Sequence, residues 1–592
     1  MRTVILERAP EDIERRKASD PATIVSGAHI YCAGAARALL RFSTCDQFYA
    51  ADPGPDSEHS LLRSDQGDGR CLEYLSDDAV KRLSSEDEIV ILTDRPILDV
   101  MAPLRHRLQR RDAPVVGMIH ALQGPPVLLV RMLLSGDVHA HDAIMCSTAS
   151  GRRGLENLIE SARDKLFRAF GVTLDFNPQL EVIPLGVDTT ALDARARRDE
   201  ARARLGVGNG EVVLLYFGRF SALYKCDLVP LLLAFARLDR RGRQVRLWLA
   251  GDDAQERMAD RLRRVSGELG IGEAVVVTPD PAAEDRLDLL AAADVFVSPS
   301  DNLQETFGIT LAEAMAAALP IVASDWDGYR ELVTEGVTGL LVPTTMPRLP
   351  DGFDLFDLPS PLPGLETVAQ TTVVDIEALA AALQTLADSR ELRTRFGERA
   401  RAEACARFEW RVIVRRYEEL WATLVERGRR TRGLLPPRSA LFDNPSYQHA
   451  FGHYPTRFLE ETDLLELATA VPHDSTAVDR LVGTRGGFDA SLFRRTIDVV
   501  AADGPMSLRD LLQRTAPTGD GRTLVAAHAA RLLKYGVLRT VSMPGAGDEP
   551  LRLAEGRAEA ATAFSGAAGR VRARRGAAPS SGSATCRPAR TE

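Results

Sequence analysis

The chain has 592 residues, of which 45% are hydrophobic and 27% are charged. This is the composition of a folded globular protein, and the length predicts several domains at roughly 150 residues each. The 74 Lys and Arg residues against 83 Asp and Glu residues give a formal net charge of -9, which disfavours nucleic-acid binding driven by overall charge.

The cysteines and the N-terminal residues predict where the protein works. The 7 cysteines are scattered without a C-x-x-C pair, which favours neither a disulfide framework nor a zinc knuckle. The opening MRTVILERAPEDIERR has no long apolar core, and no run of about 18 apolar residues follows anywhere. We therefore expect a cytoplasmic protein with no transmembrane segment.

Short apolar runs alternate with helical stretches from residue 88 onward. The runs are EIVILT, PVVGMIHAL, HDAIMCST and LEVIPLGV, and each has the length and composition of a buried parallel strand. Alternating strands and helices build doubly wound α/β sheets. Residues 1–205 are therefore predicted to form a Rossmann-like domain.

A second series of apolar runs begins after a glycine-rich turn at residues 206–210. The runs are VVLLYFG, QVRLWLAG, AVVVTP, DVFVSPS and PIVASD, and they predict a second Rossmann-like domain over residues 206–407. Two such domains are expected to face each other across a cleft, where ligands commonly bind.

The rest of the chain departs from this pattern. Residues 346–371 carry five prolines and predict an irregular insertion. Residues 408–435 predict a terminal helix that crosses back, followed by a basic linker with Pro and Gly. Residues 436–555 predict a mostly helical accessory domain, and the Ala-, Gly- and Arg-rich residues 556–592 predict a disordered tail.

The segment SDNLQETFGITLAEAMAAALP, from residue 300, predicts a ligand site at the start of a helix. Glu305 and Glu313 are eight residues apart, a distance of about 12 Å along a helix, which is comparable to the reach of a nucleotide-sugar from sugar to ribose. The helix dipole and first amides would bind a diphosphate, and the residues that would offer them are Phe307, Gly308 and Ile309. The alternative is an ordinary amphipathic helix.

The segment VVLLYFGRFSALYK predicts a strand that ends at Gly218 and is followed by two cations. Arg219 and Lys225 come after the strand terminus, where open α/β sheets bind ligands, and Arg offers a bidentate fork to phosphate. Taken alone, both are more typical of surface cations than of a phosphate site.

Together these segments resemble the retaining GT-B glycosyltransferases of group 1, also called family 4, which act on nucleotide-sugars. The resemblance is carried by FGRF with YK, LWLAGDD, the long segment LLAAADVFVSPSDNLQETFGITLAEAMAAALPIVASDWDGYRELV, and FEWRVIVRRYEELW. VIPLGVDTTAL is similar to the interdomain segment of that family. Coverage is strong over residues 180–425 and weaker over residues 88–150.

The resemblance implies a role for each matching residue. Glu305 would lie by the donor sugar and Glu313 would bind the ribose, while Arg219 and Lys225 would neutralise the leaving diphosphate, next to Gly218. Such enzymes are metal-independent and use no cofactor, because the nucleotide-sugar is a substrate. They transfer its sugar to an acceptor hydroxyl with retention, through a same-face displacement.

Other positions are weighed against the same family. His120 occupies a strand end where the N-terminal domain of the family often presents a histidine to the reaction centre. Cys226 and Ala318 stand where the family usually has glycine. The acceptor loop is best matched by GAHIYCAGAARALL, with Gly34 at its turn.

Two further patterns are read as structural. The triplet D-W-D from residue 325 has the form of a D-x-D metal motif but falls in a turn after a strand, so no metal site is expected. The pattern H-x-H-D from residue 139 is read as a solvated turn because it has no third ligand at a known spacing.

The accessory region predicts a winged-helix-like module. Its order of helix, turn, helix and short strand ends in AARLLKYGVLRTVS. Such modules bind DNA or dock proteins, and since this one is not clearly basic, nucleic-acid binding is disfavoured and homodimerisation is kept as an alternative. The leading function is a glycosyltransferase acting on a glycan or small molecule, and the alternative is a regulatory protein that senses sugar-nucleotides.

Overall fold

The computed structural model describes residues 2–8, 27–52, 70–83, 87–122, 126–254, 256–282, 285–303, 305–348, 368–433, 456–468, 490–516 and 520–541. The predicted tail at 556–592 and most of the insertion at 346–371 lie outside these ranges. The chain divides into two compact units, Met1–Asp443 and Asn444–Glu592, and each is described by itself.

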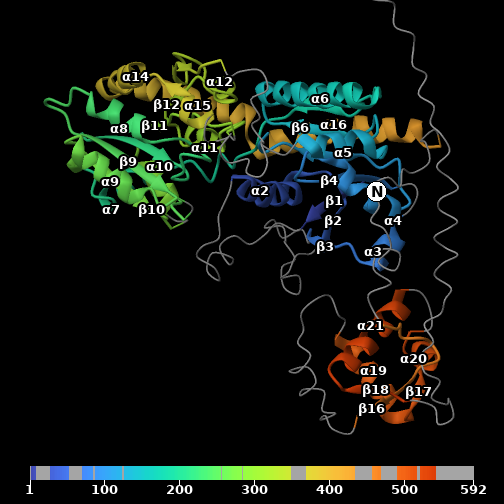
Figure 1. Ribbon diagram of the computed structural model, residues 1–592. Coiled ribbons are helices and arrows are strands. Elements are labelled where there is room, and N and C mark those ends of the chain that lie inside the picture. Colours follow the sequence, from blue (N-terminus) through green and yellow to red (C-terminus); the bar gives the residue numbers. More distant parts are fainter. Residues whose placement is uncertain are drawn as a thin grey trace, which may run out of the picture. The chain divides into compact units, whose positions relative to one another are not determined.

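The first sheet of the larger unit has seven strands, and neighbouring strands run parallel (Figure 1). Its order is β3-β2-β1-β4-β5-β6-β7, so the chain reverses direction across the sheet between β1 and β4. The strands are β1 Arg2–Arg8, β2 Gln47–Asp52, β3 Leu72–Tyr74, β4 Glu88–Leu92, β5 Val115–Met118, β6 Ala143–Cys146 and β7 Gln179–Val182.

The second sheet repeats this plan with six parallel strands (Figure 1). Its order is β10-β9-β8-β11-β12-β13, and the reversal falls between β8 and β11. Open α/β sheets bind ligands at the carboxyl ends of the two strands that flank such a reversal. The strands are β8 Val212–Phe217, β9 Val245–Gly251, β10 Val275–Pro279, β11 Val295–Ser298, β12 Ile321–Ser324 and β13 Gly339–Val342.

Helices connect the strands of both sheets. Those of the first sheet are α2 Gly27–Phe42, α3 Asp77–Arg82, η1 Leu98–Met101, α4 Ala102–Arg107, α5 Pro126–Ser135 and α6 Ala149–Phe170. After β7, η2 Arg195–Arg197 and α7 Arg198–Arg204 pack on a helix of the second domain. Those of the second are α8 Val229–Ala236, α9 Ala259–Glu268, η3 Gly272–Ala274, α10 Asp285–Ala292, α11 Ile309–Ala316, α12 Tyr329–Leu332, α14 Ile376–Asp388 and α15 Arg390–Arg407. A short antiparallel pair joins β14 Thr344–Thr345 to β15 Val373–Val374.

Both sheets are buried on both faces, which explains their continuous apolar runs. Val4 and Ile5 are neighbours in β1, yet they belong to different core clusters because successive side chains of a strand point to opposite faces. Leu214 and Leu215 of β8 divide in the same way. The prediction of two Rossmann-like α/β domains is confirmed.

Helix α16, Trp410–Thr431, joins the end of the second domain to the first. It packs on α2 and β4, and the indole of Trp410 lies where a Cβ at Gly34 or Gly186 would contact or overlap it. Gly34 therefore lies inside helix α2 and packs on α16, so its predicted place at the turn of an acceptor loop is wrong.

The described residues of the smaller unit form three helices and an antiparallel sheet of order β17-β16-β18. Its core is built from Leu465, Leu511, Val525 and Leu532, each fully buried. The predicted mostly helical C-terminal region is confirmed. Its elements are β16 Leu464–Leu467, α19 Ala490–Asp503, β17 Met506–Ser507, α20 Leu508–Thr515, α21 Asp520–Lys534 and β18 Leu538–Val541.

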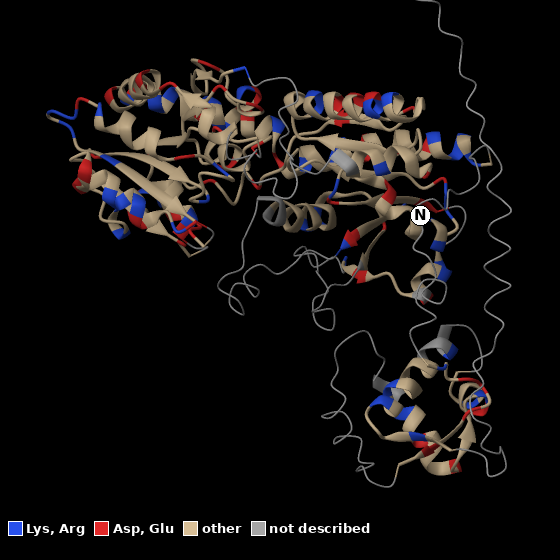
Figure 2. Cartoon of the chain, in the orientation of Figure 1, with Lys and Arg blue, Asp and Glu red and all other residues tan. Residues whose placement is uncertain are grey.

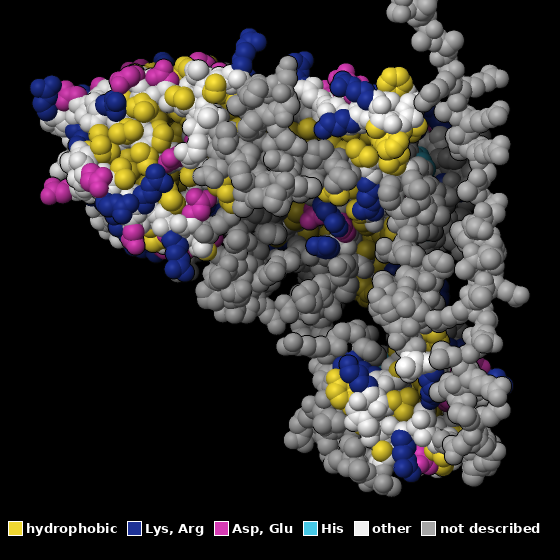
Figure 3. Space-filling model, in the orientation of Figure 1, with side chains coloured by type: hydrophobic (Ala, Val, Ile, Leu, Met, Phe, Trp, Pro, Cys, Tyr) yellow, Lys and Arg dark blue, Asp and Glu magenta, His cyan; other side chains and the backbone are white. Residues whose placement is uncertain are grey.

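Charge is distributed as the composition suggests. Figure 2 shows that blue (Lys, Arg) and red (Asp, Glu) residues are mixed along the helices, while the central strands are mostly tan. On the face drawn in Figure 3, described side chains of both signs lie between apolar ones. Within the described ranges, every helix is too short or too polar to cross a bilayer.

Candidate active site

The loop after β8 carries the two predicted cations and has a fixed shape. Its backbone passes so close to β9 that a Cβ at Gly251 would overlap the carbonyl of Gly218. Arg219 Nη2 donates to the carbonyl of Tyr224 at 3.0 Å. The hydroxyl of Tyr216 donates to the carbonyl of Arg219 at 2.8 Å. The guanidinium is thus folded over its own loop.

Glu256, after β9, holds this loop from outside. Its carboxylate accepts hydrogen bonds from the Ser221 hydroxyl and from the amides of Ala222, at 3.1 Å, and Leu223, at 3.3 Å. A carboxylate that accepts several such bonds pins the backbone that donates them. The sequence analysis missed Glu256, because nothing in its local pattern shows that it faces a loop 30 residues earlier.

Lys225 and Glu305 meet at the reversal point of the second sheet. Lys225 Nζ forms an ion pair with Glu305 Oε2, although 80 residues separate them. The exposed fractions of the two side chains are only 7% and 15%, so the pair is largely shielded from water. Loops after β8 and β11 supply one partner each, and this is the strand pair that flanks the reversal.

Helix α11 begins beside this ion pair. Gly308 is its N-cap residue with φ 91°, in the left-handed region, and no side chain caps the first turn by a hydrogen bond. Its Cβ position is filled by the ring of Tyr329. Phe307 turns away, because its ring packs edge-on against Phe408 with centroids 5.6 Å apart. Only the backbone of residues 307–309 can therefore serve an anion, as the sequence analysis assumed.

Glu313 lies one helix turn further, on the buried side of α11. It is 7% exposed and forms an ion pair with Arg286 of α10. Within the described part of the chain Arg286 Nε has no hydrogen-bond partner. The sequence analysis did not single out Arg286, since a lone Arg in the first turn of a helix has no distinctive spacing.

Two polar residues after β11 support the same loop. Asp301 Oδ2 accepts from the amide of Asp227 at 3.3 Å, and Asn302 Nδ2 donates to the carbonyl of Leu223. Burial raises the pKa of Asp301 to about 8. At neutral pH this carboxyl is therefore mostly protonated. Because Asp301 is only 4% exposed, the neutral form lowers the free-energy cost of burying it.

The first domain contacts two parts of the second domain directly, namely the loop before α11 and helix α12. Thr306 Oγ1 donates to the carbonyl of His120 at 3.1 Å, and Thr148 Oγ1 donates to the carbonyl of Thr306 at 2.8 Å. Glu331 of α12 accepts from the amides of Ala149 and Ser150, each at 2.7 Å, at the start of α6. A carboxylate at a helix N-terminus is favourable because of the helix dipole.

His120 joins an aromatic group in the first domain. Its ring lies edge-on to Tyr31 with centroids 5.8 Å apart, and Nε2 is 4.0 Å from Cys32 Sγ. Tyr31 stacks on Trp410 at 5.3 Å and its hydroxyl bonds that of Tyr417. The main-chain carbonyl of His120, rather than its imidazole, makes the contact with Thr306 described above.

Two readings of polar motifs can now be compared with the structure. His139, His141 and Asp142 are buried, so the expected solvated turn is wrong. Asp142 pairs with Arg105 and accepts from the amide of Val115 at 2.8 Å, which ties the starts of β5 and β6 together. In the described ranges, no group of three His, Cys, Asp or Glu side chains is placed to hold a metal.

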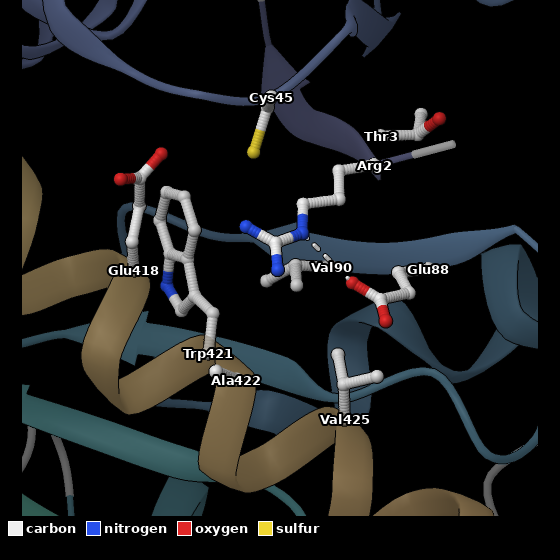
Figure 4. A pocket seen from close by; sticks show the side chains of 9 residues that line it. All are labelled: Arg2, Thr3, Cys45, Glu88, Val90, Glu418, Trp421, Ala422 and Val425. Carbon is white, nitrogen blue, oxygen red and sulfur yellow. Dashed lines mark hydrogen bonds and ion pairs between the residues drawn. The ribbon is translucent and has the colours of Figure 1, made fainter.

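A separate pocket lies between β1, β4 and α16 (Figure 4). Its lining includes Glu418 and Arg2, whose Nε donates to Glu88 at 3.0 Å. Thr3 Oγ1 and Trp421 Nε1 line it without a hydrogen-bond partner among the described residues. The volume of about 30 Å³ suits ordered water, and it is far too small for a nucleotide-sugar.

Residues 197–349 match the family model described as glycosyl transferases group 1. These residues include the whole of β8 to β13 and every predicted donor-site residue, whereas His120, the catalytic candidate of the first domain, lies outside them. The chain therefore contains a group 1 glycosyltransferase domain, which supports its assignment as a transferase.

Similar proteins include D-inositol 3-phosphate glycosyltransferases from several bacteria. A D-inositol 3-phosphate glycosyltransferase of Nocardia farcinica is 34% identical over 198 residues, which are 33% of this chain and 42% of the relative. One of Catenulispora acidiphila is 33% identical over 244 residues, or 39% and 55% of the two chains. One of Kineococcus radiotolerans is 30% identical over 313 residues, or 50% and 61%. The chain thus spans about half the length of these relatives.

Solved structures with a similar arrangement are glycosyltransferases and synthases. Anabaena HepE with UDP and glucose has 17% identity and a TM-score of 0.47, and the match covers 72% of this chain and 100% of that one. Sucrose-phosphate synthase from Thermosynechococcus elongatus has 19% identity and a TM-score of 0.46 over 72% and 100% of the two chains.

Proposed function

We propose that the protein is a retaining glycosyltransferase that moves a sugar from a nucleotide-diphosphate-sugar to an acceptor hydroxyl. The observation that carries the proposal is the shielded Lys225–Glu305 pair, which lies at the sheet reversal beside a helix start that no side chain caps. The group 1 domain match over residues 197–349 supports it.

The proposed roles follow from charge and position. Lys225, Arg219 and the amides of residues 307–309 stabilise the diphosphate as negative charge develops on it. Glu305 faces the donor sugar. Glu313, which forms an ion pair with Arg286, accepts hydrogen bonds from the ribose hydroxyls. The leaving phosphate assists removal of the acceptor proton on the same face of the sugar, and His120 lies on the acceptor side. These groups supply the needed positive charge, so we propose a reaction without a metal or cofactor.

The acceptor is a separate proposal. The relatives are named for D-inositol 3-phosphate, so this compound is the first acceptor to test. The matched domain holds donor-site residues rather than the aromatic group around His120. A glycan or another small molecule is therefore tested beside it.

The smaller unit supports a second proposed role, in docking. Helices α19, α20 and α21 with β17 and β18 follow the order of a winged helix, but β16, which pairs with β18, precedes the first helix. Several of its described arginines pair with acids: Arg509 and Arg522 with Glu461, Arg514 with Asp503, and Arg539 with Glu466. Neutralised arginines suit protein docking, including homodimerisation, better than binding to a DNA backbone.

The cysteines suit a reducing compartment. Cys32, Cys45, Cys146, Cys226 and Cys405 form no disulfides, and such thiols are typical of cytosolic proteins. We propose that the protein works in the cytoplasm.

The experiment incubates the purified protein with UDP-, GDP-, ADP- and TDP-sugars, with and without inositol 3-phosphate, and measures nucleotide-diphosphate release. The double variant Arg219→Ala/Lys225→Ala tests the site. Arg241→Ala is the matched control, because Arg241 pairs with Asp239 and its side chain is 91% exposed. Release by the wild type and the control, but not by the double variant, is expected.

Two other outcomes would contradict the proposal. If the double variant released nucleotide as fast as the wild type, the site would lie elsewhere. If the wild type neither released nor bound any nucleotide, the resemblance would concern the scaffold alone, and the sensing alternative would fail with it. Binding without release, even with acceptors, would favour the sugar-nucleotide sensor.

A further inference from the structure

Tyr329 is a fully buried tyrosine at the start of α12. Its hydroxyl lies 2.8 Å from Ser298 Oγ at the end of β11, and it accepts from Lys225 Nζ at 3.4 Å. Its ring fills the space beside Gly308, where a Cβ would overlap Tyr329 Cε1. One side chain therefore touches the end of β11, the lysine after β8 and the N-cap of α11.

Burying the Tyr329 hydroxyl here lowers stability relative to a phenylalanine unless the hydroxyl makes hydrogen bonds. A buried polar group lowers stability unless it is hydrogen-bonded, and a ring alone would pack equally well against Gly308. Burial and the nearby Glu305 charge raise the pKa of the Tyr329 phenol well above its usual range, so the hydroxyl stays neutral. A neutral oxygen can accept a proton-bearing group such as the Lys225 ammonium without adding charge.

We propose that Tyr329 is the positioning residue for Lys225. An ammonium has three N–H donors. Glu305 accepts from one and Tyr329 from another, which leaves the third for the diphosphate of the donor. Ser298 fixes the hydroxyl that does this, and the ring links the same residue to the helix start at Gly308. The inference rests on the proposed function for its catalytic consequence, but the geometry around Lys225 does not depend on that function.

The test compares Tyr329→Phe and Ser298→Ala with Tyr417→Phe. The last variant removes a buried tyrosine hydroxyl bonded to Tyr31 in the first domain, and it serves as the matched control for loss of a buried hydrogen bond. Tyr329→Phe keeps the ring against Gly308. A hydrogen bond to a charged group is worth about 1.5–3 kcal/mol, which converts to a fall in kcat of roughly 10- to 100-fold. The donor KM should change by less than about threefold.

A second measurement does not need turnover. The acetylation rate of Lys225 by an amine-reactive ester is followed by mass spectrometry from pH 7 to pH 10, with exposed Lys81 as the internal reference. Losing the Tyr329 oxygen removes one hydrogen-bond acceptor from Lys225 Nζ and leaves that group less restrained, so its acetylation at a given pH should rise several-fold in Tyr329→Phe, by less in Ser298→Ala, and not in Tyr417→Phe.

The outcomes separate the two proposals. Unchanged Lys225 acetylation in Tyr329→Phe, or a fall in kcat no larger than that of Tyr417→Phe, would overturn the role of Tyr329. If the wild type released no nucleotide from any donor but Lys225 acetylation still rose in Tyr329→Phe, the glycosyltransferase proposal would fail while the positioning role stood.

Discussion

The candidate donor site and the aromatic group of the first domain are built in opposite ways. The donor side, formed by Arg219, Lys225, Glu305, Gly308 and Glu313, comes from two short segments and is joined by ion pairs and backbone amides. The aromatic side, formed by Tyr31, His120, Trp410 and Tyr417, comes from three distant segments and is joined mainly by ring packing. A substitution among the polar residues at the strand ends can alter binding or catalysis and leave the hydrophobic core intact. A substitution among the packed rings alters the core itself.

The largest expected effect tests the donor side. Glu305→Gln removes the charge beside the donor sugar but keeps an oxygen for Lys225. Loss of one electrostatic group of this kind lowers kcat by about 10²- to 10³-fold. We expect the melting temperature to change little, as measured by calorimetry beside single-turnover kinetics.

Its control is Glu377→Gln, an exposed carboxylate that pairs with Arg237 in the same domain. Glu305→Gln with kcat within threefold of the control would show that the Lys225–Glu305 pair only supports the fold, and the contrast between the two sides would disappear.

A matched pair of glycine substitutions sharpens the comparison. A Cβ at Gly186 would overlap the indole of Trp410, and one at Gly308 would overlap the ring of Tyr329. Overpacking costs about 1–3 kcal/mol. Gly186→Ala should therefore lower the free energy of unfolding and leave nucleotide affinity unchanged, while Gly308→Ala, at φ 91°, should also weaken diphosphate binding by tenfold or more, about 1.4 kcal/mol.

Urea unfolding and calorimetric titration with nucleoside diphosphates measure the two effects. Equal losses of affinity in both variants would mean that the aromatic side shapes the donor site, and the division drawn above would be wrong.

The segments of the donor side could be singled out because its residues are neighbours in the chain. Glu305 and Gly308 are three residues apart, and Gly218 and Lys225 follow one strand. The choice of an anion site over an ordinary helix with surface cations came from the family resemblance and stays a prediction. Tyr329 and Glu256 were missed because their contacts cross from other loops of the sheet. Pattern also failed at His139, where burial against Arg105 is a property of the fold rather than of the local sequence.

A smaller effect concerns the pH dependence of stability at Asp327, where the second domain meets Ser150 of the first domain. Burial, with help from the charges of Glu305 and Glu331, raises the pKa of Asp327 to about 6, against a hydrogen bond from Ser150 that lowers it. The unfolded value is about 3.9. The folded protein therefore binds more protons between these two pH values, and this group makes the free energy of unfolding fall as pH rises through that window.

Asp327→Asn should remove this contribution. The variant is expected to gain melting temperature over the wild type at pH 7.5 and to lose that advantage at pH 4.5, and asparagine accepts the backbone φ of 41° at this position. Melting curves at both pH values measure the difference. A gain that is the same at both would show that Asp327 does not titrate in this range.

The smallest effect concerns the turn before β12. Ala318 has φ 62°, in the left-handed region where the related family usually has glycine. Relief of that backbone outweighs the extra chain entropy of glycine slightly, so Ala318→Gly should stabilise the protein by less than about 1 kcal/mol without changing kcat. A loss of stability in urea unfolding would mean that the methyl group packs usefully.

The first domain cannot finish folding during synthesis until helix α16 has been made. The first domain ends its own strands at residue 182, yet the helix that covers α2 and β4 spans residues 410 to 431. While the ribosome makes the more than 200 residues between them, the apolar surface around Tyr31 and Val90 has no covering helix. Exposed surface of this kind favours aggregation and chaperone binding. A truncation that stops before α16 should therefore leave a nascent chain that is bound by chaperones, even though every strand of its sheet is present.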